Sequence, residues 1–136
     1  MVVYEVECAP GDRPDLVPPP ASYGWAHFHA LTALLAAEEQ ICLEEMMDYG
    51  GVVPWSRVET CLRPIFDLSL VDDGVLPLKW VMGMQSRLHE VCAAWKGGFY
   101  AGNVERDMKG EQFAELVRLV SVVDYCVSVG RSMRVR

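Results

Sequence analysis

The feature that most constrains the fold is a long amphipathic stretch over residues 24–49, GWAHFHALTALLAAEEQICLEEMMDY. When each residue advances about 100° around a helix, the apolar side chains of this stretch gather into one broad stripe. The side chains within roughly 60° of Glu38 on that wheel are His27, Leu31, Leu34, Leu35, Ile41, Cys42, Glu45 and Tyr49. Such a stripe has to be buried, so the stretch predicts a long central helix that ends at Gly50 and Gly51.

Two acidic residues, Glu38 and Glu45, lie inside this apolar stripe. A carboxylate in apolar surroundings is unfavourable unless it is paired, and its pKa rises if it is not. In the simpler interpretation the two acids reach solvent or pair with a base, and Arg87 on a later helix is the best candidate. In the alternative interpretation they form a carboxylate site inside a helical bundle, to which His27 contributes.

Three further segments are expected to complete a mainly α fold, a compact bundle of about four helices. Residues 54–65, residues 77–96 and a last segment that begins near residue 103 or 107 carry apolar side chains at helical spacing. Pro64 should kink or end the helix over residues 54–65, because proline lacks the backbone N–H that an interior position donates. At this length the sequence predicts a single globular domain over residues 1–136.

The remaining segments are expected to lie outside the bundle. Residues 2–8 alternate in polarity, which predicts a short strand that needs a partner. Residues 9–22 contain three consecutive prolines and predict a loop, and residues 131–136 predict a solvated basic tail. Residues 117–129 are rich in valine, which favours strands. An α+β fold in which this segment pairs with residues 2–8 is therefore the alternative.

The charges are unevenly distributed along the chain. Residues 1–75 hold 13 acids and 3 bases, whereas residues 76–136 hold 6 acids and 9 bases. Such a division bears on association rather than on fold. The two halves can pack together, cross-complement each other in a homodimer, or offer an acidic face to a basic partner. Direct nucleic-acid binding by the front half is not expected, because phosphate contacts need lysine and arginine.

Membrane association, a zinc site and a cofactor are not expected either. No apolar run approaches the roughly 18 residues of a spanning helix, and the N-terminus lacks the pattern of a signal peptide, so a cytoplasmic location is expected. The five cysteines are scattered without the close pairs of zinc sites, and no cofactor motif is present. Cys92, with Lys96 one turn later, has weak features of a reactive thiol.

Two functional hypotheses follow from these patterns. The first is a non-enzymatic protein–protein interaction module, a regulator or inhibitor whose acidic face binds a protein with a basic or apolar surface. Its expected interaction residues are Glu38, Glu39, Glu44, Glu45, Asp48 and Arg87. The second is a small metal hydrolase that holds Mg²⁺ or Mn²⁺ with carboxylates of the first and last helices. Its candidate residues are His27, Glu38, Glu45 and Asp124.

Overall fold

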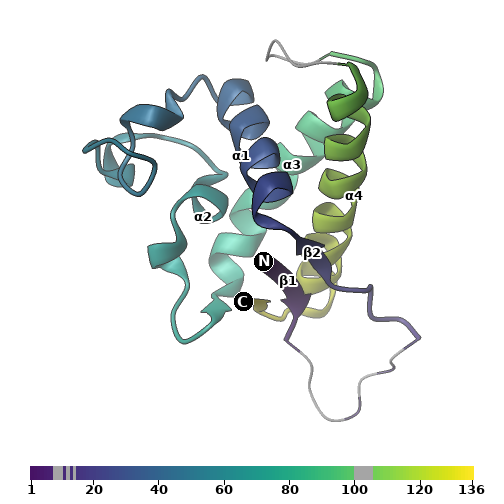
Figure 1. Cartoon of the computed structure of the whole chain (residues 1–136). Coiled ribbons are helices and arrows are strands. Elements are labelled where there is room, and N and C mark those ends of the chain that lie inside the picture. Colours follow the sequence, from purple (N-terminus) through teal and green to yellow (C-terminus); the bar gives the residue numbers. More distant parts are fainter. Residues whose placement is uncertain (8–10, 12, 14, 100–105) are drawn as a thin grey trace.

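A computed structural model describes residues 1–7, 11, 13, 15–99 and 106–136, with only the backbone described for residues 106–110. Within these residues the fold consists of four α-helices and a four-stranded antiparallel sheet (Figure 1). The helices are α1 (Trp25–Glu38), α2 (Arg63–Phe66), α3 (Leu78–Lys96) and α4 (Arg106–Val129). The strands are β1 (Val2–Val6), β2 (Ala21–Tyr23), β3 (Val75–Leu76) and β4 (Met133–Val135). Three short 3-10 helices are η1 (Leu43–Glu45), η2 (Trp55–Arg57) and η3 (Leu68–Leu70).

The sheet gives the N-terminal strand a neighbour on each side. The strand order is β2-β1-β4-β3, and Tyr4 of β1 lies opposite both Ala21 of β2 and Val135 of β4. Alternate side chains of β1 are buried, as expected for a strand with one face on the core: Val2, Tyr4 and Val6. The predicted strand at the N-terminus is confirmed, and the partners it required are β2 and β4.

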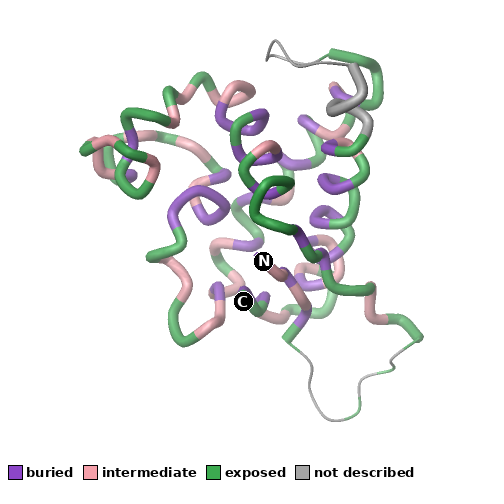
Figure 2. The backbone as a smooth tube through the Cα atoms, in the orientation of Figure 1, coloured by how far each residue is buried: buried purple, intermediate pink, exposed green. Residues whose placement is uncertain are grey.

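α4 joins the other two long helices to the sheet. α4 packs along α3 and also contacts α1, β1 and β2. The stripe predicted for the third helix is confirmed, because its residues at helical spacing are buried against α4 and the rest of the core: Val81, Met84, Leu88, Val91 and Trp95. Pro77 caps this helix in an extended conformation. The buried hydrophobic side chains of helices, sheet and loops form one continuous cluster. Figure 2 shows buried positions in all of these parts of the chain.

The prediction of one helix over residues 24–49 was wrong in its second half. α1 ends at Glu38, and Gln40 adopts a left-handed conformation with φ of 56°. The amides of Gln40 and Ile41 then donate back to the carbonyls of Ala37 and Ala36, at 3.1 and 2.9 Å. This paired arrangement is the Schellman motif, which ends a helix by satisfying its last carbonyls. Glycine or asparagine usually occupies the left-handed position, so glutamine gave no warning of the helix end.

The second predicted helix, over residues 54–65, is also largely absent. Only η2 and the four-residue α2 form there, and Pro64 lies in the first turn of α2. Proline is tolerated in a first turn because that N–H would have no helical partner. Pro64 therefore starts a short helix instead of ending a long one.

At the C-terminus the predicted last helix is confirmed, and the prediction of a solvated tail was wrong. Residues 117–129 belong to α4, so they are not the strand that the α+β alternative proposed. The strand instead lies within the predicted basic tail, where Met133 and Val135 are buried and Arg134 is exposed. The last helix was expected to begin near residue 103 or 107. Residue 103 lies outside the described residues, and the helix is described from Arg106. The fold is thus a mixture of helices and a sheet, and a bundle of helices alone describes it only in part.

The segment between α1 and β3, residues 39–74, is called the acidic lobe below. It holds eight acids and two bases. It lies beside α1 at the left of Figure 1 and carries two of the three 3-10 helices ahead of α2. The lobe is joined to the core through its own buried side chains, which are Met46, Trp55, Leu62, Ile65 and Phe66. Among the described helices, none is long and apolar enough to cross a membrane.

Candidate functional site

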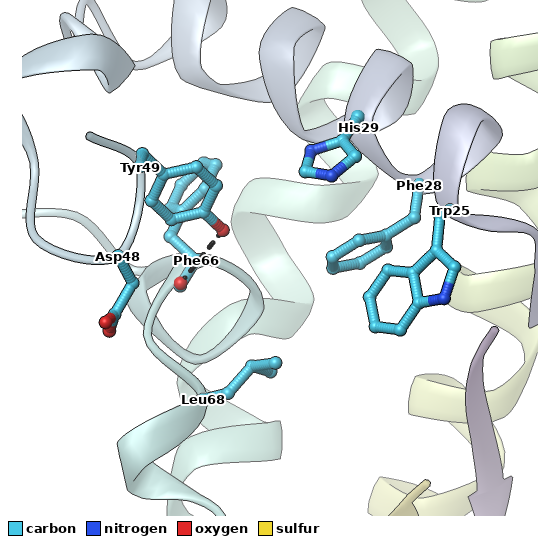
Figure 3. A pocket seen from close by; sticks show the side chains of 7 residues that line it. All are labelled: Trp25, Phe28, His29, Asp48, Tyr49, Phe66 and Leu68. Carbon is cyan, nitrogen blue, oxygen red and sulfur yellow. Dashed lines mark hydrogen bonds between the residues drawn. The ribbon is translucent and has the colours of Figure 1, made fainter.

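A pocket of about 220 Å³ opens between α1 and the acidic lobe (Figure 3). We call it the aromatic pocket, and the residues that line it are Trp25, Phe28, His29, Asp48, Tyr49, Phe66 and Leu68. In Figure 3, Tyr49 and Phe66 lie on one side, Trp25 and Phe28 on the opposite side, and Leu68 on the floor. The two sides come from segments that are distant in the sequence, so the folded chain is needed to assemble the pocket.

The helical side of the pocket follows from the spacing of two aromatic residues. Trp25 and Phe28 lie three residues apart in the first turn of α1, so they occupy one face of the helix. Phe28 is buried and lies near Tyr4, with ring centroids 6.5 Å apart. Trp25 remains 59% exposed. This side therefore combines an anchored ring with a ring that is open to a ligand.

The side formed by the acidic lobe is held by stacking and by a hydrogen bond. The hydroxyl of Tyr49 donates to the backbone carbonyl of Phe66 at 3.0 Å. The ring of Trp55 stacks on Phe66, with centroids 5.2 Å apart and planes 4° apart. Burial raises the pKa of Tyr49 to about 12, with Asp48 and Asp67 adding to the effect. The hydroxyl thus stays protonated near neutral pH and keeps its donor role.

Asp48 lines the edge of the aromatic pocket, and in Figure 3 its carboxylate points away from the space between the rings. Its backbone has a φ of 72°, a left-handed conformation that aspartate and asparagine tolerate better than most residues. Within the described part of the chain, its side chain makes no ion pair and accepts no hydrogen bond. A carboxylate in this position is available to a ligand.

Two further cavities extend the aromatic pocket into a groove. One, of about 230 Å³, shares Asp48 and reaches Arg63 and Asp67, which pair with each other at 3.1 Å. The other, of about 330 Å³, shares Trp25 and Leu68 and reaches Arg136. The guanidinium of Arg136 is 3.1 Å from the carboxylate of Glu5. The arginines of the groove are therefore neutralised by acids, whereas Asp48 is not neutralised by a base.

The predicted interaction residues at the end of α1 are engaged with α3. Arg87 Nε donates to Glu39 Oε1 at 2.7 Å, Arg87 Nη2 donates to the backbone carbonyl of Glu38 at 3.3 Å, and Nη1 donates to Glu90 at 3.0 Å. The hydrogen bonds to Glu39 and Glu90 raise the pKa of Arg87, the bond to Glu39 most strongly. The carboxylate of Glu38 instead accepts from Trp95 Nε1 at 2.7 Å. Arg87 thus binds this region as predicted, although its carboxylate partner there is Glu39.

The other predicted acids of the front half lie in the acidic lobe. Glu44 and Glu45 are exposed in η1, and Asp48 is exposed in the turn that follows. The expectation that Glu45 faces a helical interior was wrong, because α1 ends before it. The apolar stripe could not place it once Gln40 had redirected the chain.

His27 has a partner that the sequence reasoning missed. Its Nδ1 lies 2.7 Å from Glu115 Oε1 and 4.0 Å from Glu111 Oε2, both on α4. Glu115 is buried, and its backbone carbonyl accepts a hydrogen bond from the hydroxyl of Tyr23. Glu111 and Glu115 are four residues apart, so they lie on one face of α4. This spacing is the sequence signal that could have indicated an acidic partner for His27.

Asp124 is engaged on the opposite side of α4 from the candidates of α1. Its Oδ1 lies 2.7 Å from His89 Nε2 and accepts from Gln85 Nε2 at 2.9 Å. Desolvation raises the pKa of the nearby Cys92 thiol and Asp124 raises it further, although Lys96 lowers it. Cys92 therefore stays protonated at neutral pH and lacks the activation of a nucleophile.

The four candidate residues of the hydrolase hypothesis thus lie in four different environments. His27 pairs with α4, Glu38 with Trp95, and Asp124 with side chains of α3, while Glu45 is exposed in the acidic lobe. Over the described residues, no group of three or more histidine, cysteine, aspartate or glutamate side chains could hold a metal ion. The structure does not bring these candidates together.

Comparisons with protein-family models, with curated proteins and with solved structures found no match. The functional argument therefore rests on the geometry of the aromatic pocket and on the charge of the acidic lobe. Sequence reasoning singled out Asp48 but missed the aromatic residues around it. Their side chains come from α1, a turn, α2 and η3, and no periodic pattern connects those segments.

Proposed function

We propose that this protein is a non-enzymatic protein–protein interaction module that binds a basic partner through the acidic lobe and the aromatic pocket. By covering a basic surface of the partner, it would act as a regulator or inhibitor. The single observation that carries the proposal is the exposure of Trp25 and Leu68 on the aromatic pocket beside the unpaired carboxylate of Asp48. Apolar side chains that gather beside polar groups at a surface are typical of interaction sites.

The exposed charges of the acidic lobe support a basic partner. Six of its eight acids are exposed, and they are Glu44, Glu45, Asp48, Glu59, Asp72 and Asp73. Of its two bases, Arg63 pairs with Asp67, which leaves Arg57 as the exposed base. A surface with such a balance attracts positively charged partners and disfavours acidic ones.

Internal pairing occupies two bases of the rear half that a cross-complementing homodimer could otherwise use. Arg87 already pairs with Glu39, and Arg136 with Glu5, so bases of the rear half are used within one chain. The acids of the acidic lobe remain for another molecule. The homodimer and the cytoplasmic location expected from the sequence stay predictions.

The proposal is tested by affinity capture from the native cell with matched charge reversals. The first bait is the wild-type chain, and the second carries Glu44→Lys and Glu45→Lys in the acidic lobe. The third bait carries Glu7→Lys and Glu111→Lys, which change the charge equally at exposed positions outside the lobe. Recovered proteins are quantified by mass spectrometry, and the fold of each bait is checked by its melting temperature.

We expect at least one basic protein whose recovery falls about tenfold with the lobe variant. The introduced lysines repel the basic surface of the partner that the wild-type glutamates attract. Its recovery with the control variant should stay close to that of the wild type. If no protein distinguishes the lobe variant from the control variant, the acidic lobe is not a docking surface and the proposal fails.

A further inference from the structure

We propose that the aromatic pocket receives a lysine or arginine side chain of the partner, with its charge directed toward Asp48. This inference rests on the proposed function and deepens it, because it assigns the chemistry of the group that the partner inserts. The apolar stem would lie between the rings, and the cation would extend past Tyr49 and Phe66 toward Asp48, which also lines the next cavity. In Figure 3 the carboxylate of Asp48 lies beyond these two rings.

The walls of the pocket suit a cation with an apolar stem. Aromatic rings stand on both sides, with Trp25 and Phe28 from α1 facing Tyr49 and Phe66 from the acidic lobe (Figure 3). Aromatic faces attract ammonium and guanidinium groups, tryptophan most strongly. Lysine and arginine bury their methylene stems along apolar surface while the charged end stays polar. Leu68 on the floor provides such a surface.

The charges around the pocket favour a cation over a neutral side chain. Asp48 is the carboxylate of the lining, and none of the seven lining residues is lysine or arginine. Arg63, in the adjoining cavity, is already paired with Asp67 at 3.1 Å. A neutral side chain would leave the exposed carboxylate of Asp48 without a charged partner. A basic side chain would supply the missing partner.

The conformation of Asp48 allows its charge to be tested separately from its backbone. Its φ of 72° is one that aspartate tolerates better than most residues. The carboxylate is held there with no ion pair or hydrogen bond in the described part of the chain. Asparagine tolerates the same backbone conformation, so Asp48→Asn removes the charge and keeps the turn.

The test measures binding of three short peptides to the full chain by NMR. The peptides are acetyl-Gly-Gly-X-Gly-Gly-amide, in which X is lysine, arginine or norleucine. Norleucine has the stem of lysine without its ammonium group, so it is the neutral control. Titration is followed at the indole N–H of Trp25, assigned with Trp25→Phe, which alters an exposed side chain.

We expect the lysine or the arginine peptide to bind about tenfold more tightly than the norleucine peptide. Asp48→Asn should reduce that preference by about fivefold while the affinity for norleucine stays the same. Equal binding of norleucine would mean a merely apolar pocket and would overturn the inference. The absence of a saturable shift with every peptide would overturn it as well.

The two proposals fail in different ways. If no peptide binds but the Glu44→Lys and Glu45→Lys bait still loses its partner, the acidic lobe docks a partner and the pocket inference alone is wrong. If the basic peptides bind selectively but no protein distinguishes the baits, the pocket chemistry stands and the docking function of the acidic lobe is wrong.

Discussion

The carboxylate of Glu38 accepts a hydrogen bond of 2.7 Å from the indole Nε1 of Trp95. This contact explains how an acid can lie within the apolar stripe of α1, because a buried or half-buried carboxylate is tolerated when it is hydrogen-bonded. The adjacent Glu39 is bound by Arg87, also from α3. Together the two acids join the end of α1 to α3 and fix the point from which the acidic lobe departs.

Removal of Arg87 should loosen this junction. Arg87→Met leaves Glu39 partly buried without its charged donor, so we expect a loss of about 1.5–3 kcal/mol in the free energy of unfolding. Urea denaturation monitored by circular dichroism provides the measurement. Arg57→Met is the control, because Arg57 is exposed in the acidic lobe, and its effect should stay within about 0.5 kcal/mol. Equal effects of the two substitutions would contradict the importance of the junction.

Two tyrosines should respond oppositely to loss of the hydroxyl. Tyr49→Phe removes the donor to the Phe66 carbonyl and should cost about 1 kcal/mol. Among the described residues, the buried hydroxyl of Tyr4 has no hydrogen-bond partner, so Tyr4→Phe should be neutral or stabilising by up to about 1 kcal/mol. Denaturant unfolding of both variants decides the point. A destabilisation by Tyr4→Phe as large as that of Tyr49→Phe would contradict it.

Stability should fall in alkaline solution. Burial raises the pKa of Tyr49 to about 12, above its ordinary value of 10.0, and burial also raises the pKa of Tyr4 and Tyr23. Above pH 10 the unfolded chain therefore loses protons that the folded chain keeps, and the unfolded state gains stability. Each such tyrosine contributes a fall of up to about 1.4 kcal/mol per pH unit, which stops once its folded pKa is passed.

Unfolding free energies measured between pH 8 and pH 11.5 by urea denaturation would show this fall. Tyr49→Phe should make the dependence shallower between pH 10 and pH 11.5, since one of the raised groups is gone. A stability that is constant across this interval in the wild type would contradict the burial of these hydroxyls.

Divalent cations should not stabilise the fold. The acids of the hydrolase hypothesis are engaged separately, with Glu38 bound to Trp95 and Asp124 bound to Gln85 and His89. Because a ligand that binds the folded state raises the melting temperature, Mg²⁺ or Mn²⁺ at millimolar concentration should leave it unchanged. A rise that Glu38→Gln or Asp124→Asn abolishes would revive the carboxylate site.

The sequence predicted elements well where local patterns dominate. α3 follows from Pro77 and a regular apolar stripe, and β1 follows from alternation. The end of α1 was missed because the left-handed position is filled by Gln40 instead of glycine. β4 was missed because arginines make up half of residues 131–136. The alternation of Met133, Arg134 and Val135 was the available signal, and it places the two apolar side chains on the core face.

The candidate site was less accessible to sequence reasoning than the fold. The surplus of acids in residues 39–74 could be counted and led to the acidic face. The aromatic pocket could not be found this way, because Trp25 and Phe66 meet across it only after α1 ends and the acidic lobe folds back. Tertiary packing, and not any local period, places the rings on opposite sides of one space.

Photo-crosslinking in the native cell tests the central claim most directly. A benzophenone amino acid replaces Leu68 on the aromatic pocket in one strain and Val117 on α4 in another, since these side chains are exposed to 41% and 40%. If the acidic lobe and the aromatic pocket dock a protein, irradiation will give a discrete crosslinked product from position 68, weakened by Glu44→Lys with Glu45→Lys, and none of that size from position 117. Crosslinking from position 68 that is absent, or no stronger than from position 117, would contradict the account.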